Sequence, residues 1–287
     1  MEDEGATLAC LASYAQQLQS LHAGLTLALL GTSNTTAWAA RRLGKLLRQT
    51  ATSSRPVVIG AGQGTTGTTS LALALQLLNF TVWHADRVYG PPGSPTKTKW
   101  REPIINILRR TAIKPAHSGA VGGSARKCNK ELDALDYRLP HSTQALVDVP
   151  APDVFLDLLW AQPKAFVILS TRPKEEWVER RIADHPVSGM LPVDRPCGAM
   201  LNTWPRSLSE ALLGSHEQLV RCVTPPQRLL ELCIACPKWQ AGRGNASEPQ
   251  MGDLARLASF LNVTAPVPIE FPHQRHTKAP HISLHSP

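Results

Sequence analysis

The chain has 287 residues, of which 43% are hydrophobic and 18% are charged. This composition excludes wholesale disorder, and the length is sufficient for one large domain with a buried core. Thirty Lys and Arg residues against 22 Asp and Glu residues give a formal charge of +8. That charge favours a polyanionic partner such as a nucleotide, a nucleic acid or a sulfated glycan.

The first 55 residues form an alanine-rich helical pattern with a basic amphipathic run at 41–48, and residues 5–85 contain no acidic side chain. We expect this N-terminal helical extension to pack on the core rather than to lie on a membrane surface. Residues 24–40 come nearest to a membrane span, but polar residues at 33–36 interrupt them. No transmembrane segment is therefore expected.

Signals for the cellular compartment conflict. The acidic start of the chain differs from the basic start of a secretory signal, which favours the cytoplasm. Six irregularly spaced cysteines predict buried thiols rather than a disulfide framework or a redox or zinc site. A location in the Golgi lumen stays open, because Asn-x-Ser/Thr sequons begin at Asn34, Asn79, Asn245 and Asn262.

A change of character at residue 56 marks the predicted start of the main domain. Residues 57–59 are typical of a buried strand, residues 60–67 of a glycine-rich loop, residues 68–78 of a helix and residues 80–84 of a second strand. Strand, glycine loop, helix and strand in this order predict the opening of a parallel α/β sheet.

Residues 90–130 are rich in Pro, Gly, Ser, Lys and Arg and predict a long surface insertion with one helix at 102–110. Beyond it we expect strands at 145–148, 165–170 and 228–233, and helices at 153–161, 174–183, 216–223 and 252–261. Residues 273–287 form a tail rich in His and Pro, without the Cys or carboxylate partners of a metal site. The predicted main domain is therefore 56–272, and no metal is expected.

The glycine loop is the strongest local signal for function, because its N–H groups and the positive end of the next helix form an anion site. A nucleoside-triphosphate loop requires lysine where Thr68 stands, so ATP or GTP hydrolysis is disfavoured. A dinucleotide fingerprint also fits, since Asp86 follows the glycines by about 19 residues. Its glycines are Gly62, Gly64 and Gly67. An NAD- or FAD-dependent oxidoreductase of the Rossmann type is therefore an alternative.

A further interpretation comes from a family resemblance. Residues 62–71 resemble the loop of a sulfotransferase-like family, which runs Gly-x-Gly-Arg-Thr-Gly-Thr-x-Ser-Leu. Three more stretches, at 148–158, 163–177 and 254–273, resemble segments of the same family in the same order. The resemblance implies an α/β fold of the P-loop NTPase-like, three-layer kind, with a central parallel sheet flanked by helices.

The resemblance also implies an activity: transfer of a sulfuryl group from 3′-phosphoadenylyl sulfate to a hydroxyl or amine. The acceptor would be a small molecule or a glycan, and neither nucleic acid nor metal would take part. The residues implied in binding the 5′-phosphosulfate are Gly64, Thr65, Thr66, Gly67, Thr68, Thr69 and Ser70. Arg172 and Arg180 are implied for the 3′-phosphate, but Arg180 and Arg181 fit a solvated basic helix face equally well.

The transfer requires a base that takes the proton of the acceptor. Asp148, at the end of a predicted strand, is the expected base, and His84, at the end of the second strand, is the alternative. A turn carboxylate beside Pro150 is the purely structural interpretation of Asp148.

One departure from the family pattern affects the chemistry directly. Thr65 stands where the family carries Arg or Lys, which would neutralise charge on the transferred group. Either a cation comes from elsewhere, with Lys97, Lys99 and Arg101 as candidates, or the chain binds the nucleotide with weak or no activity.

Overall fold

The computed structural model describes residues 4–23, 29–30, 32, 34–48, 56–85, 87–90, 100–110, 121–139, 142–187, 189–233, 253–264 and 271–272. A six-stranded sheet lies at the centre of this described part. Its strands are β1 (Val58–Gly60), β2 (Val82–His84), β3 (Arg87–Tyr89), β4 (Ala145–Val147), β5 (Phe166–Ser170) and β6 (Leu229–Leu232). The order is β3-β2-β4-β1-β5-β6, and the pairings are parallel except that between β2 and β3.

The position of β1 in the sheet distinguishes this fold from a dinucleotide-binding one. β1 pairs with β4 and β5, and β4 separates it from β2. In the dinucleotide-binding sheet the first strand lies directly beside the second. The α/β fold with a mostly parallel central sheet, expected from the sulfotransferase resemblance, is therefore confirmed, and the dinucleotide fingerprint has no support from the topology.

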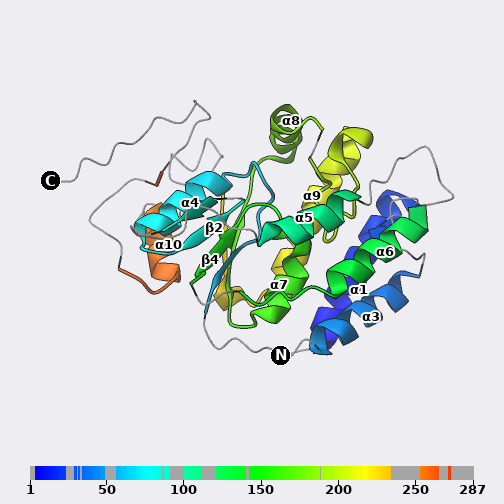
Figure 1. Ribbon diagram of the computed structural model, residues 1–287, viewed down its shortest axis with the longest axis horizontal. Coiled ribbons are helices and arrows are strands. Elements are labelled where there is room, and N and C mark those ends of the chain that lie inside the picture. The colour runs from blue at the N-terminus through cyan, green and yellow to red at the C-terminus, as the bar shows by residue number, and fades with distance from the viewer. Residues whose placement is uncertain are drawn as a thin grey trace, which may run out of the picture.

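Helices cover both faces of the sheet (Figure 1). They are α1 (Glu4–Leu21), α3 (Thr35–Arg48), α4 (Thr68–Leu77), α5 (Arg101–Arg110), α6 (Val121–Asp133), α7 (Phe155–Ala161), α8 (Lys174–Asp184), α9 (Arg206–Val223) and α10 (Asp253–Phe260). Because successive side chains of a strand point to opposite faces, Val58 packs with α4 and α10 while Ile59 packs with the core that contains α7 and α9. Two cores on one sheet make three layers.

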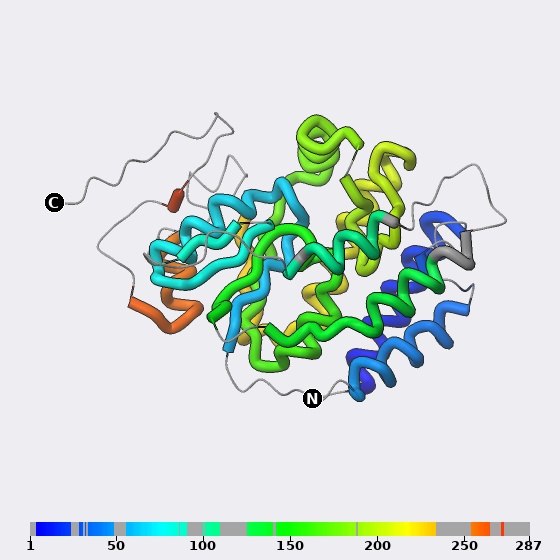
Figure 2. The backbone as a smooth tube through the Cα atoms, in the orientation of Figure 1, coloured from blue at the N-terminus to red at the C-terminus, as the bar shows by residue number. Residues whose placement is uncertain are grey.

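The N-terminal helices are joined to the rest of the fold. α1 packs against α3 and α9. The N-terminal helices α1 and α3 both contribute buried residues to the same core as α7. In Figure 2 these helices, in blue, lie with α6 at the end of the molecule opposite α4 and α10. The described helices α1 and α3 thus pack on the core, whereas the extension 1–55 as a unit and the domain boundary at residue 56 stay predictions.

The cysteines correct the prediction of buried free thiols. Cys10 of α1 is bonded to Cys222 of α9, and Cys128 of α6 is bonded to Cys197, each pair with Cα atoms 5.8 Å apart. Cys233 is disulfide-bonded as well. The two mapped bonds fasten helices outside the sheet to segments far away in the sequence.

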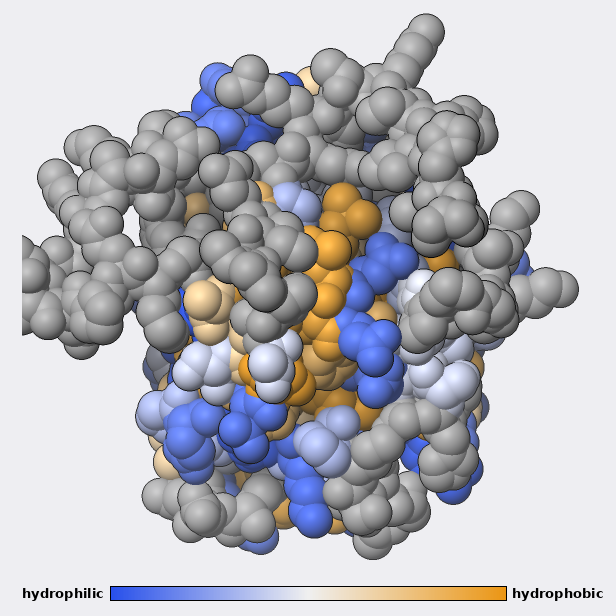
Figure 3. Space-filling view, turned by 90° about the vertical axis from the view of Figure 1, so that its left-hand side faces the viewer, coloured by the Kyte–Doolittle hydropathy of each residue, from blue (hydrophilic) through white to orange (hydrophobic). Residues whose placement is uncertain are grey.

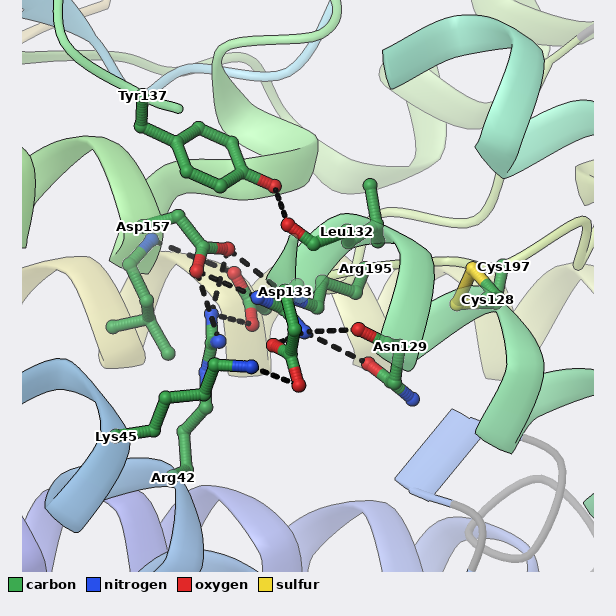
Figure 4. A network of polar contacts seen from close by, with 12 residues as sticks. Arg42, Lys45, Cys128, Asn129, Leu132, Asp133, Tyr137, Asp157, Arg195 and Cys197 are labelled. Carbon is green, nitrogen blue, oxygen red and sulfur yellow. Dashed lines mark hydrogen bonds and ion pairs between the residues drawn. A yellow bond between two sulfur atoms is a disulfide. The ribbon is translucent and has the colours of Figure 1, made fainter. Parts of the chain in front are cut away.

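A buried polar network fastens α3 and α6 to α7 (Figure 4). The carboxylate of Asp157 on α7 accepts hydrogen bonds from Arg42 of α3 at 3.0 and 2.8 Å, and from Arg195 at 3.0 and 2.6 Å. Arg195 also donates to Asn129 and Asp133 of α6. All the ionised groups in the interior of the network are therefore paired, as burial requires.

Two segments differ from the sequence expectation. α6 runs through residues assigned to a surface insertion, and its Ala125, Cys128 and Leu132 are fully buried. α9 begins at Arg206, ten residues before the predicted helix. Both helices are held by tertiary packing, which overrides the weak local propensity of their Gly- and Ser-containing sequences.

The described surface is mixed in character. Seen from the side of α4 and α10, a column of hydrophobic side chains lies between hydrophilic ones (Figure 3). The large hydrophobic side chains that are exposed, Leu47, Leu77, Ile182 and Val187, lie on different elements, which is ordinary for a protein surface. Among the described helices, none has the length and apolar character needed to cross a membrane.

Candidate active site

The glycine loop connects β1 to α4 and is fixed by contacts with β5. The Thr66 hydroxyl lies 2.7 Å from the Ser170 hydroxyl and 2.6 Å from the Gln63 carbonyl oxygen. A Cβ atom added at Gly62 would collide with Ser170, so only glycine fits there. Gly67, with φ of 96°, turns the chain into α4. The first amide groups of a helix have no intrahelical acceptor, so the end of this loop has the geometry of a potential anion site.

Two residues at the site have a backbone conformation that ordinary side chains rarely adopt. Thr65 in the loop has φ of 72°, and Asp148 directly after β4 has φ of 68°. For a β-branched residue such as Thr65 this conformation is especially unfavourable. The Thr65 hydroxyl is also buried without a hydrogen-bond partner in the described part of the chain. Strain and unsatisfied polar atoms of this kind concentrate at functional sites.

His84, at the end of β2, meets the start of α4 and the end of β4. Its Nε2 atom lies 3.3 Å from the Thr68 hydroxyl, 3.4 Å from the Thr69 hydroxyl and 3.6 Å from Oδ2 of Asp148. Both expected base candidates therefore lie together at the carboxyl edge of the sheet, where ligands bind in open α/β folds.

Helix α8 approaches the loop from the other side. The indole N–H of Trp177 donates to the Gly64 carbonyl oxygen at 2.8 Å. One turn later, the Arg181 guanidinium lies so close to Gly64 that an added Cβ atom would collide with its Nη1 atom. The same Cβ atom would lie 3.0 Å from Oδ1 of Asp148. Gly64 thus lies between a cation and a carboxylate.

Arg181 is buried, with 6% of its surface exposed. Its Nε atom has no hydrogen-bond partner, and no ion pair within 4.0 Å joins its guanidinium to a carboxylate of the described residues. The expectation that Arg181 belongs to a solvated helix face is wrong. It lies four residues after the buried Trp177 and therefore on the same face of α8, whereas Arg180 is exposed.

Asp153, which the sequence analysis did not single out, interacts electrostatically with Arg181 and Asp148. Burial raises the pKa of its carboxyl to about 7; Arg181 opposes this rise, and Asp148 adds to it. Its Oδ2 atom has no hydrogen-bond partner in the described structure. Asp153 therefore changes its protonation state near neutral pH. The residue follows Pro152 at the start of a short helix, a pattern that alone predicts only a helix start.

The two arginines expected at the 3′-phosphate lie on or just before α8. Arg172 follows β5 by two residues, and its Nη1 atom donates to Glu176 at 2.9 Å. Partial burial lowers the pKa of Arg172, and its Nε atom is buried without a partner. Arg180 is exposed. Both side chains stay candidates for phosphate binding.

Some expected residues fall elsewhere. Asp86, Lys97 and Lys99 lie outside the described residues, as does the Arg101 side chain, although Arg101 begins α5. Ser70 is buried in the first turn of α4, beside the loop residues. Among the described residues, Asp148, Trp177 and Arg181 approach Gly64, and His84 lies beside Asp148.

Comparison with known proteins agrees with this geometry. Residues 57–181 match the family model of the sulfotransferase domain. The match begins just before β1 and ends at Arg181, so it includes the glycine loop, His84 and Asp148. No curated protein matches the chain. Residues 57–181 are therefore similar to the sulfotransferase domain, and this match supports a sulfotransferase-like family.

Proposed function

We propose that the chain transfers a sulfuryl group from 3′-phosphoadenylyl sulfate to a hydroxyl or amine of a small-molecule or glycan acceptor. One observation carries the proposal: the carboxylate of Asp148 lies directly against the anion-binding loop at Gly64. A displacement at sulfur needs an anion cradle and a proton acceptor side by side, because the acceptor must lose its proton as it attacks.

The donor carries anionic groups at two ends, and the site offers separate groups for each. The loop from Gly64 to Ser70, with the start of α4, would hold the 5′-phosphosulfate through backbone N–H groups and the hydroxyls of Thr68 and Thr69. Arg172 and Arg180 would hold the 3′-phosphate. Arg172 would then exchange or share its contact with Glu176, which is a partly exposed pair and so inexpensive to rearrange.

The two base candidates take different roles in this proposal. Oδ2 of Asp148 faces Nε2 of His84, whereas Oδ1 of Asp148 faces the loop. Asp148 therefore removes the proton from the acceptor, and His84 orients its carboxylate. The acceptor oxygen or nitrogen forms a bond to sulfur, the bond from sulfur to the bridging phosphate oxygen breaks, and adenosine 3′,5′-bisphosphate leaves with that electron pair.

A second candidate is a protein that binds the nucleotide without transferring its sulfuryl group. Thr65 favours this candidate, because the loop itself carries no cation to stabilise the leaving phosphate. An Asp148→Asn variant separates the two. Under the proposal the variant binds adenosine 3′,5′-bisphosphate as well as the wild type does, but loses at least about 100-fold in transfer rate.

Calorimetric titration of the full chain with adenosine 3′,5′-bisphosphate, NAD, FAD and ATP tests the donor class. Micromolar binding of the bisphosphate alone is expected, with a loss of at least about 10-fold in Arg172→Ala. Arg138→Ala is the matched control, since Arg138 is exposed and pairs with Asp136. Binding of NAD or FAD without the bisphosphate would contradict the proposal and favour the oxidoreductase.

A further inference from the structure

We propose that Arg181 provides the positive charge that Thr65 does not provide, by binding the anionic group held on the glycine loop. The identity of that group, the 5′-phosphosulfate of the donor, rests on the proposed function. The assignment to Arg181 rests on its own position: a buried guanidinium in contact with Gly64, without a hydrogen-bonded or ion-paired partner among the described residues.

A buried arginine without a partner is unfavourable and calls for a ligand. The Nε–H group of Arg181 is buried without a hydrogen-bond partner among the described residues, and such a group carries a desolvation penalty. The other buried arginines of the fold show the usual solution, since Arg42 and Arg195 each bond the Asp157 carboxylate. Arg181 differs from them in having a free guanidinium beside an anion-binding loop. A phosphate or sulfate there would match the planar fork of the guanidinium.

Helix α8 fixes the distance between Arg181 and the loop. Trp177, one turn earlier, is fully buried and donates its indole N–H to the Gly64 carbonyl oxygen. The loop residue that Arg181 contacts is thus bonded to the same helix that carries Arg181. A charge held on a rigid element can stabilise the leaving phosphate without reorganisation during the reaction.

The carboxylates near Arg181 do not replace such a ligand. Asp148 and Asp153 both lie near the guanidinium, but neither forms an ion pair with it within 4.0 Å. Burial raises the pKa of Asp153 to about 7, so this carboxyl is partly neutral at physiological pH. Asp148 becomes neutral when it takes the proton of the acceptor, which strengthens the attraction between Arg181 and the departing phosphate.

The test uses two nucleotides that differ in one phosphate. Adenosine 3′,5′-bisphosphate has a phosphate for the loop, whereas adenosine 3′-monophosphate has none. We expect Arg181→Gln to lower the affinity for the bisphosphate roughly 10- to 100-fold. The affinity for the monophosphate should stay within about 2-fold of that of the wild type. Arg172→Ala should lower the affinity for both nucleotides. Arg138→Gln, which removes an exposed charge, should leave the affinity for both nucleotides unchanged.

The outcomes separate the inference from the proposed function. If the wild type binds neither nucleotide, the proposed donor is wrong. If the wild type binds the bisphosphate and a folded Arg181→Gln variant binds it equally well, the donor stands and the role of Arg181 is wrong. An equal loss for both nucleotides would likewise contradict the assignment of Arg181 to the loop.

A second pair of variants covers the case in which Arg181→Gln does not fold. Arg181→Lys keeps the charge but loses the planar fork, and we expect it to weaken the bisphosphate by roughly 3- to 10-fold. Adding Thr65→Lys to Arg181→Lys should raise the affinity for the bisphosphate again by at least about 3-fold, because it places a cation in the loop itself. No loss in Arg181→Lys together with no gain from Thr65→Lys would overturn the inference.

Discussion

Replacing Asp157 by Asn should be among the most damaging substitutions away from the site. The Asp157 carboxylate is fully buried and accepts four hydrogen bonds, two from Arg42 and two from Arg195. An amide keeps one acceptor oxygen and turns its N–H donors toward one N–H group of each guanidinium. Breaking a buried pair in this way costs about 3–5 kcal/mol, because buried charge is left uncompensated. The free energy of unfolding in urea measures this cost directly.

The same change should lower the melting temperature by roughly 6–20 °C for a chain of this size. Asp136→Asn is the control, since Asp136 pairs with Arg138 on the surface and should contribute no more than about 1 kcal/mol. A loss below about 1 kcal/mol in Asp157→Asn would refute the reasoning, because it would mean that the network repacks without this carboxylate.

The pH dependence of stability provides an independent check on Asp157. Burial alone would raise the pKa of this carboxyl, but Arg195 and Arg42 outweigh burial and hold the pKa well below its usual value. A lowered pKa contributes stability above the unfolded pKa of about 4, and that stability is lost as the pH falls further. The wild type should therefore lose stability below pH 4 more steeply than Asp157→Asn does.

Three further variants test other contacts. Trp177→Phe removes the hydrogen bond to the Gly64 carbonyl oxygen and should cost about 1–3 kcal/mol in urea unfolding. Replacing both Cys10 and Cys222 by Ala should cost about 2–4 kcal/mol in the same assay, because it frees a very long loop in the unfolded chain. Asp153 has a pKa raised to about 7, so the folded state holds its proton more tightly than the unfolded state does. As the pH rises from 4 to 7, the free energy of unfolding of the wild type should therefore fall by roughly 1.4 kcal/mol per pH unit relative to that of Asp153→Asn.

Each of these variants has an outcome that would contradict its reasoning. Unchanged stability in Trp177→Phe would mean that the Gly64 carbonyl oxygen finds another donor. Equal stability of the Cys10→Ala, Cys222→Ala chain and the wild type under oxidising conditions would mean that the disulfide does not form. Parallel pH profiles for the wild type and Asp153→Asn would mean that Asp153 titrates normally in the folded protein.

The sequence predicted the elements whose signals are local. Residues 58–60 are β-branched or glycine and lead into a glycine loop, so β1 and the start of α4 were expected almost at their observed bounds. The same holds for β5, whose apolar run is buried in the sheet centre. His84 and Asp148 were expected at strand ends, and parallel strands bring their carboxyl ends to one edge of the sheet.

The residues that the sequence did not predict depend on long-range packing. Six cysteines allow 15 pairings, and the spacing does not say that Cys10 meets Cys222. Asp153 is perturbed because the fold buries it, which no neighbour in the sequence reports. Arg181 is different, since its spacing of four residues from Trp177 is a local signal that puts both residues on one face of α8, although the sequence analysis did not use it.

Residues outside the matched family segment also hold the glycine loop in place. His216 of α9 is fully buried, and its Nε2 atom donates to the Ala61 carbonyl oxygen at 2.8 Å. Burial lowers the pKa of His216 to about 4, so the ring stays neutral and keeps this donor at physiological pH. α9 is in turn bonded to α1 through Cys222 and Cys10. The N-terminal helix therefore supports the loop through a continuous chain of contacts, and damage to that disulfide should loosen the anion site as well as the fold.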